Sequence, residues 1–533
     1  MSNDQKGALP LWAPNRRAVL SGVAGSAALL SIGARGATMV SPGLFSLGVA
    51  SGDPAPDGVV LWTRLAPRPW DEDGGMPSSR IPVRWEVALD MQFAHVVRFG
   101  TAFAEPSGAH SVHVDVRGLR PAYGYYYRFI AAGEASPVGR TRTAPARGAA
   151  VDRLRVCFGS CQKYEVGHYA AYRHIVAEDP DLILFLGDYI YEDSVKPDEE
   201  QVRSVGHAEP MDLVGYRMRY AFYKCDPLLQ AAHAAAPWAM TWDDHEVAND
   251  YGGARDQYNS DPIVFLGRRA AAYRAYLEHQ PLRAALRPHA SDIRLYRTLD
   301  WGSLAQFQII DDRQYRGAPA CQPAGLAEAH QKYRSLIDTC PDLHDSKRTM
   351  LGDQQERWLM DRLSDTRAQW NILAQQTLMH QQARIDPAHP DRGNQYGADT
   401  WSGFPAARDR IFRHWAAAGT PNPLALGGDI HAFAAAEIHH PDRPDDPPIA
   451  AEYVGGSITS LLHDKSFKGL AKANGLGFAE DAMRGYGRLD LTPVGGSVTF
   501  RGLADSRQIA SGVSDIARFA LLPDEHGLHT ETP

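Results

Sequence analysis

The chain has 533 residues, of which 44% are hydrophobic and 22% are charged, and these proportions exclude a disordered, collagen-like or coiled-coil protein. Its 55 Lys and Arg residues against 63 Asp and Glu residues leave a net charge of −8, with no long basic run, so we expect no stable nucleic-acid binding. A chain of this length has room for two or three domains.

The first 37 residues are predicted to be an export signal. Arg16 and Arg17 precede a mild apolar run of about 16 residues, rich in Gly, Ala and Ser, that ends near Gly33. This run is shorter and less apolar than a transmembrane helix, which needs ~20 strongly apolar residues. The paired arginines resemble the twin-arginine signal, which is read by the Tat export machinery; an ordinary secretory signal is the alternative. No later segment is long and apolar enough to span a membrane, so we expect a periplasmic or secreted protein.

Residues 44–145 are predicted to form an N-terminal β-sandwich domain. Short apolar or alternating runs recur there between Gly, Pro and Asp residues, for example at 58–65 (GVVLWTRL) and 110–116 (HSVHVDV). Such spacing is typical of fibronectin-like or immunoglobulin-like sandwiches. Residues 143–152 are small and irregular, as expected of a linker.

From residue 153 onward, predicted strands alternate with predicted helices, which indicates an α/β domain over residues 153–516. The predicted strands begin at 153, 182, 237, 303, 370, 423, 449, 488 and 497, and the predicted helices cover 169–178, parts of 212–234, 351–365 and 405–419. Residues 517–533 form a tail, for which packing on the domain and plugging of the functional site are both open.

The five cysteines fall into different environments. Cys321 and Cys340 flank a polar loop, so we expect a local disulfide between them in an oxidising compartment. Cys157 lies within an apolar strand and is expected in the core, whereas Cys225 has no evident partner.

Potential metal ligands follow the predicted strands that end near residues 159, 186, 242 and 426. In open α/β sheets, functional sites form beyond the carboxyl ends of the strands, so these residues are expected to meet. Each alone is a weak signal, since Asp often serves in turns and buried Cys often only packs. Together they favour a multivalent metal, because uncompensated buried anions are costly. The candidates are Cys161, Asp188, Tyr191, Asp244, His245, Asp429 and His431.

Blocks of sequence along nearly the whole chain resemble one family. They are 45–65, FGSCQKYEVGHYAAYRHI (158–175), LFLGDYIYED (184–193), TWDDHEVANDY (241–251), DDRQYR (311–316), LGDQQERWL (351–359), WNILAQQTLM (370–379), DTWSGFPAARDRI (399–411), GGDIHAF (427–433) and GSITS (456–460). Together these blocks resemble the PhoD-type alkaline phosphatases and phosphodiesterases, which are related to metallophosphoesterases and purple acid phosphatases.

The resemblance implies an α/β (α+β) metallophosphoesterase-like fold, with two sheets face to face and helices outside. It also implies a ferric ion (Fe³⁺) and calcium (Ca²⁺), which suit these donor types. Asp188 would bridge from the iron to the calcium side, and Asp244 is preferred over Asp243 by motif. The implied iron ligands are Cys161, Asp188, Tyr191 and His431, and the implied calcium ligands are Asp244, Asn249 and Asp429.

The resemblance suggests a role for His245, and side-chain chemistry suggests one for two arginines. His245 would support the ligands or act as an acid or base together with Asp244. Arg313 and Arg316 are candidate phosphate clamps, with structural ion pairs as the equal alternative. His380 follows a predicted strand, but the family pattern does not require it as a ligand.

The function implied is that of an exported, metal-dependent alkaline phosphatase or phosphodiesterase. It would hydrolyse phosphate esters with a metal-activated water or oxide, for phosphate scavenging. A phospholipase D-like phosphodiesterase and a non-catalytic extracellular binding protein are the alternatives. A serine hydrolase is disfavoured, because residues 455–460 lack the Gly-x-Ser-x-Gly pattern.

Overall fold

The computed structural model describes residues 43–195, 200–283, 293–327, 329–385, 388–462 and 467–532. The predicted export signal, residues 1–37, lies outside the described residues. Within the described ranges, no helix combines the length and apolar character that crossing a bilayer requires.

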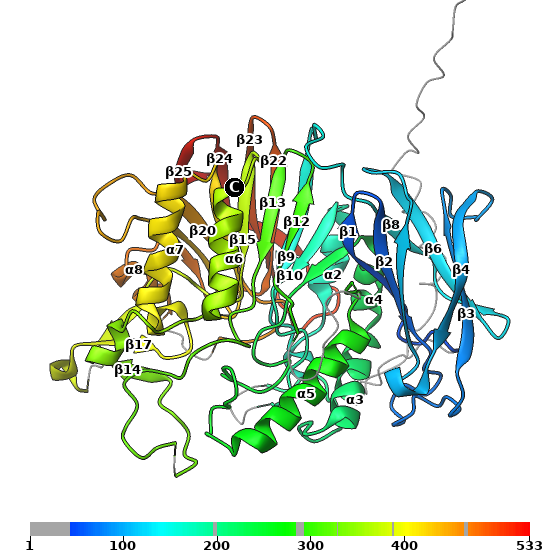
Figure 1. Cartoon of the computed structure of the whole chain (residues 1–533), viewed down its shortest axis with the longest axis horizontal. Coiled ribbons are helices and arrows are strands. Elements are labelled where there is room, and N and C mark those ends of the chain that lie inside the picture. Colours follow the sequence, from blue (N-terminus) through cyan, green and yellow to red (C-terminus); the bar gives the residue numbers. More distant parts are fainter. Residues whose placement is uncertain are drawn as a thin grey trace, which may run out of the picture. The chain divides into compact units, whose positions relative to one another are not determined.

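The largest sheet has ten strands, in the order β25-β24-β23-β22-β9-β10-β11-β1-β2-β5 (Figure 1). Strands β9, β10, β11 and β1 are parallel to one another, so their carboxyl ends share one edge. The bounds are β1 Val49–Ala55, β2 Gly58–Arg64, β5 Ser111–Arg117, β9 Leu154–Gly159, β10 Leu182–Phe185, β11 Trp238–Met240, β22 Gly485–Thr492, β23 Gly495–Leu503, β24 Val513–Leu522 and β25 Glu525–Glu531.

The second sheet has seven strands, in the order β12-β13-β15-β18-β20-β19-β21, and its central strands β13, β15, β18 and β20 are parallel. Its strands are β12 Arg297–Trp301, β13 Ala305–Ile309, β15 Trp370–Ala374, β18 Pro423–Gly427, β19 Phe433–Ile438, β20 Ala450–Gly455 and β21 Phe478–Glu480. A separate three-stranded sheet contains β14 Leu336–Asp338, β17 Asn394–Gly397 and β16 Ala383–Ile385.

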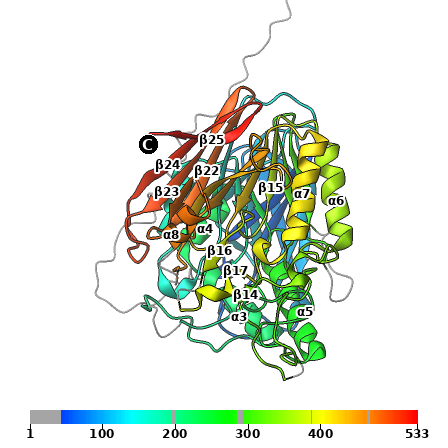
Figure 2. The same ribbon diagram turned by 90° about the vertical axis from the view of Figure 1, so that its left-hand side faces the viewer.

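The two large sheets share one apolar core, which joins Phe158 and Leu184 of one sheet to Phe307 and Ile372 of the other. Such strands are buried on both faces, which explains their nearly continuous apolar sequences. Helices α6 and α7 cover the outer face of the seven-stranded sheet (Figure 2), and helices α2 to α5 share an apolar core with β9, β10 and β11. The helices are α2 Ala170–Ala177, α3 Leu213–Lys224, α4 Pro227–Ala235, α5 Pro262–His279, α6 Gly352–Ser364, α7 Pro405–Ala418 and α8 Phe467–Ala473.

The N-terminal strands form a sandwich, but one of its two sheets is not separate from the rest of the chain. β1, β2 and β5 belong to the ten-stranded sheet, because Gly52 of β1 pairs with Trp238 of β11. The predicted boundary near residue 145 therefore crosses a continuous sheet. The opposing sheet contains β3 Ile81–Ala88, β4 Val96–Ala104, β6 Gly124–Ala131, β7 Glu134–Ala135 and β8 Gly139–Arg142, and the two share a core that includes Val59, Val87 and Tyr127.

Three features at the level of single elements extend or change the sequence-based expectations. Of the predicted tail, residues 517–531 pack on the domain, one of the two alternatives left open, since they lie in β24, β25 and the turn between them, at the edge of the ten-stranded sheet. The sequence analysis did not identify the 18-residue helix α5. Cys321 and Cys340 form a disulfide with a Cα–Cα distance of 5.8 Å, and Cys157 and Cys225 are buried free cysteines.

Candidate active site

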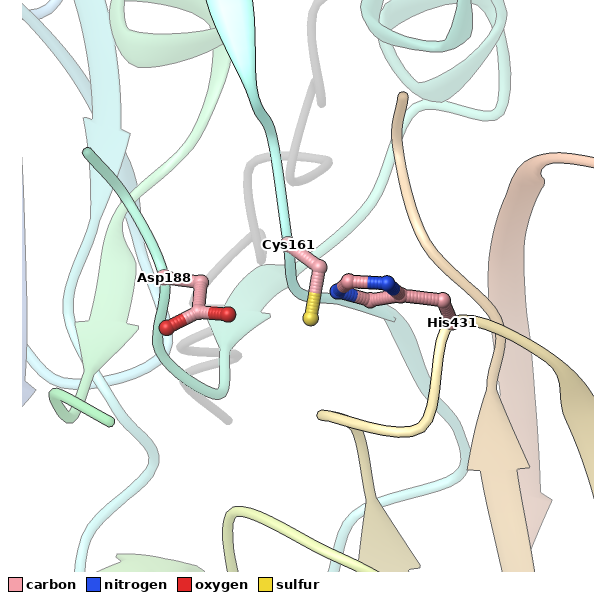
Figure 3. Close-up of side chains that lie close together, drawn as sticks. All are labelled: Cys161, Asp188 and His431. Atoms are coloured by element: carbon pink, nitrogen blue, oxygen red, sulfur yellow. The ribbon is translucent and has the colours of Figure 1, made fainter. Parts of the chain in front are cut away.

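Three candidate ligands from distant parts of the sequence meet at the carboxyl edge of the parallel strands. Cys161 follows β9, Asp188 follows β10 and His431 follows β18, and Figure 3 shows their side chains pointing toward one another. Their ligand atoms lie within 4.8 Å of one another. All three residues have left-handed backbone, with φ angles of 58°, 57° and 54°, which is uncommon for residues other than Gly and typical of functional sites.

Tyr191 closes this first group of ligands. Its hydroxyl oxygen lies 2.8 Å from Oδ2 of Asp188 and 3.0 Å from Nε2 of His431. On the other side of the imidazole, Nδ1 of His431 lies 2.8 Å from the carbonyl oxygen of Leu461. A proton on Nδ1 satisfies that carbonyl and turns the lone pair of Nε2 toward the centre, as in metal-binding histidines.

The acidic side chains of the first group need a cation beside them in order to ionise together. Burial, followed by the neighbouring Asp188 carboxylate, raises the pKa of both the Cys161 thiol and the Tyr191 phenol well above their usual values. Burial also raises the pKa of Asp188 itself. Ionising these groups together requires a positive charge among them, and a multivalent metal supplies that charge.

A second group of carboxylates lies beside the first. Oxygen atoms of Asp243, Asp244 and Asp429 lie within 4.8 Å of one another, and Asp188, Asp244 and His245 form a linking group. Oδ2 of Asp243 and Oδ1 of Asp244 are buried and accept no hydrogen bond from any described residue. Buried carboxylate oxygens left in this way fit a cation that binds oxygen, such as calcium.

Arg313 lies among these carboxylates, and its side chain is 0% exposed. Its guanidinium pairs with Asp243 and lies 3.4 Å from Asp244 and 3.6 Å from Asp429. Burial opposes ionisation of Asp244, but Arg313 and His245 outweigh it and lower the pKa of Asp244 to about 2. For Asp429, burial prevails over Arg313 and raises the pKa to about 6.

Arg316, a candidate phosphate clamp, is bonded to backbone carbonyl groups in the structure. Its guanidinium donates to the backbone carbonyl groups of Asp399, Asp250 and Tyr251, the last two at 2.7 Å. These bonds tie the loop after β11 to the loop before α7. Arg316 therefore makes backbone hydrogen bonds rather than the ion pair named as the structural alternative.

His245 and Asn249 are both held by Glu192. Nδ1 of His245 lies 2.7 Å from Oε2 of Glu192, and the backbone N–H of Asn249 donates to Oε1 of Glu192 at 2.6 Å. Burial alone lowers the pKa of His245, but Glu192 and then Asp188 raise it well above the usual value. The side-chain amide of Asn249 donates to Gln257 at 3.2 Å.

The structure also reveals supporting residues that the sequence analysis did not identify. Oε2 of Glu246 accepts the backbone N–H groups of Asp188 and Asp243 at 3.1 and 2.8 Å, and Oε1 accepts that of Tyr189 at 2.6 Å. The hydroxyl of Thr377 donates to Asp429 at 2.7 Å. Glu246 had one sequence signal, since it is an acidic residue directly beside candidate ligands at a strand end.

His380 lies outside the candidate ligand groups found among the described residues. Its backbone N–H donates to Glu452 at 2.9 Å, and burial lowers the pKa of its imidazole to about 4.

The donor types in the two groups fit two kinds of metal. Thiolate, phenolate, carboxylate and imidazole in one place suit a transition metal such as ferric iron. Carboxylate oxygens in the neighbouring group suit calcium. The residues present therefore fit the metals that the sequence resemblance implies.

Comparison with known proteins identifies the family. A model of the PhoD-like phosphatase family matches residues 156–500, and one of the N-terminal domain of PhoD-like phosphatases matches residues 33–145. The chain is 41% identical to alkaline phosphatase D of Bacillus subtilis (strain 168) over 495 residues, which cover 91% of this chain and 82% of that protein. A solved structure of PhoD matches with a TM-score of 0.85 and 41% identity, over 92% of this chain and 93% of that one. Because the sequence matches and the structural match each cover most of the chain, the chain belongs to the PhoD-like phosphatase family and is a phosphoric ester hydrolase.

Proposed function

We propose that the chain is an exported, metal-dependent alkaline phosphatase or phosphodiesterase that serves phosphate scavenging. The observation that carries this proposal is the meeting of sulfur, nitrogen and oxygen ligand atoms within 4.8 Å at the strand ends. In this proposal the layout of sheets and helices is that of a metallophosphoesterase. Cys161, Asp188, Tyr191 and His431 would hold Fe³⁺, and Asp188 with Asp244, Asn249 and Asp429 would hold Ca²⁺.

When bound, the metals supply positive charge to the phosphate oxygens and make a nucleophile available at the working pH. The chain positions the other groups. Glu192 holds Nδ1 of His245, and the ring of His245 lies against Tyr191 with a centroid distance of 4.1 Å. Nε2 of His245 is then the atom that gives a proton to the departing ester oxygen.

The metal part of the proposal is tested on purified full-length protein. Elemental analysis should find iron and calcium, and the visible spectrum should contain a charge-transfer band that is lost in Tyr191→Phe and Cys161→Ala. Cys225→Ala is the matched control, since Cys225 is also a buried free cysteine but lies at the end of α3, outside the ligand groups of the described residues. This control should retain the metals and the band.

Hydrolysis is measured in the same samples with p-nitrophenyl phosphate and bis-p-nitrophenyl phosphate. We expect both wild-type activities to fall on chelation and to recover with calcium, and their ratio measures the preference for monoesters or diesters. Folded protein with neither metal nor hydrolysis would refute the proposed function.

The export part of the proposal is supported by the Arg16-Arg17 pair and by the Cys321–Cys340 disulfide, since disulfides persist in oxidising compartments. Arg16→Lys combined with Arg17→Lys should leave the chain unprocessed in the cytoplasm on cell fractionation. Unchanged export of this double variant would instead indicate an ordinary secretory signal.

A further inference from the structure

Ser460 is a polar residue of the 456–460 block to which the proposed function assigns no role. It lies in the loop after β20, is 0% exposed, and contacts the first ligand group. Its Oγ lies 2.8 Å from the hydroxyl oxygen of Tyr191, 2.8 Å from the carbonyl oxygen of Cys161, and accepts the backbone N–H of Lys163 at 3.1 Å. One hydroxyl thus contacts two of the candidate iron ligands.

The loop that carries Ser460 is fixed from several sides. The backbone N–H of Ser460 donates to the carbonyl of Cys161 at 3.2 Å. The carbonyl of Ser460 accepts the Ser457 hydroxyl at 2.6 Å and Nη1 of Arg484 at 2.9 Å. Arg484 also donates to the carbonyl of His431. Because the backbone on both sides of the hydroxyl is bonded, the Ser460 side chain has one well-defined position relative to Tyr191.

The direction of the Ser460 hydrogen bond follows from the other groups around the Tyr191 oxygen. Asp188 offers an acceptor oxygen, and Nε2 of His431 carries a lone pair when Nδ1 donates to Leu461. Ser460 has one proton, for which the oxygens of Cys161 and Tyr191 compete. An anionic phenolate oxygen is the stronger acceptor, so the proton goes to Tyr191 when Tyr191 binds a metal.

We propose that Ser460 is a positioning residue that donates a hydrogen bond to the metal-bound oxygen of Tyr191 and thereby sets how strongly Tyr191 donates electrons to the metal. This inference rests on the proposed function, because it requires Tyr191 to bind ferric iron. Residues that hydrogen-bond to metal ligands are known to tune metal sites in this way. The hydrogen bond stabilises the filled orbitals of the phenolate, and the transition from phenolate to iron moves to higher energy.

The test is the visible spectrum of iron-loaded full-length protein. Ser460→Ala should move the Tyr191 charge-transfer band to longer wavelength by on the order of 20 nm, the spectral equivalent of losing one hydrogen bond to a charged group. Ser402→Ala is the matched control, because it removes another buried serine hydroxyl, which accepts the backbone N–H of Gln382 at 2.9 Å and lies before α7, outside the ligand groups of the described residues. This control should leave the band in place. Tyr191→Phe identifies the band.

The outcomes separate this inference from the proposed function. A band that is lost in Tyr191→Phe and unmoved in folded, iron-loaded Ser460→Ala overturns the role of Ser460 and leaves the proposed function standing. A wild-type spectrum without a Tyr191-dependent band removes the iron–tyrosinate centre itself. If Ser460→Ala does not fold, resonance Raman spectra of the wild type in H₂O and D₂O decide, since an exchangeable hydrogen bond shifts the C–O stretch of Tyr191 and an unshifted stretch refutes it.

Discussion

Replacing Glu246 by Gln should weaken metal binding without unfolding the protein. In the wild type, the carboxylate of Glu246 accepts three backbone N–H groups from the loops that carry Asp188 and Asp243. A Gln oxygen can keep the two bonds made by Oε2, but its NH₂ group then faces the N–H of Tyr189. Losing one bond to a charged group and leaving a buried donor unpaired costs about 1–3 kcal/mol. Loosened ligand loops should lower metal affinity by roughly 10–100-fold.

The assay compares denaturant unfolding of metal-free protein with calorimetric titration of the metals. Asp181→Asn is the matched control, because Asp181 lies just before the first residue of β10, at the end of the strand away from Asp188. Its carboxylate accepts the backbone N–H of Arg155 at 2.9 Å and pairs with Arg142. Both variants should lose stability, and only Glu246→Gln should lose metal affinity. Wild-type affinity in Glu246→Gln, or equal losses in both variants, would refute the role assigned to Glu246.

Other predictions address pH, the disulfide and Arg316. Burial raises the pKa of Glu452 from 4.5 to about 7, so the native state keeps a proton that the unfolded chain loses. Between pH 4.5 and 7 the free energy of unfolding of metal-free protein should therefore fall by about 3 kcal/mol more in the wild type than in Glu452→Gln; parallel pH profiles would contradict this. Cys321→Ser opens a disulfide with a sequence separation of 19 and should lower that free energy by about 3 kcal/mol, with reductant affecting the wild type alone. Arg316→Ala should lower the free energy of unfolding by about 1–3 kcal/mol in denaturant and leave inhibition by inorganic phosphate unchanged. Weaker inhibition at unchanged stability would instead show that Arg316 binds phosphate.

Local patterns in the sequence predicted the elements that bear the site. The apolar runs at β9 and β10 and the amphipathic pattern of α6 are properties of neighbouring residues, so a single segment contains the information. Candidate ligands such as Cys161, Asp188 and His431 could also be predicted from the sequence, because parallel strands bring their carboxyl ends to one edge.

Helix α5 shows where local patterns fail. It is buried on several sides and carries Arg268 and Glu278 into the interior, so it lacks a simple apolar stripe. Partners outside the helix help to satisfy those charges, since Arg268 pairs with Glu209, and Glu278 pairs with Arg217 as well as with Arg274 of α5. A local signal was present only at its start, where Asp261 caps the helix before Pro262.

The sequence by itself determined strands such as β9 and β10, helix α6, the strand-end ligands and the family resemblance. Only the tertiary structure decided that β1 extends the sheet of β11, that Glu246 joins two ligand loops, and that Arg316 holds backbone. The reason is physical: a buried polar side chain takes its role from the partners that satisfy it. For Ser460 and Tyr191 those partners are 269 residues apart in the sequence, and folding alone brings them together.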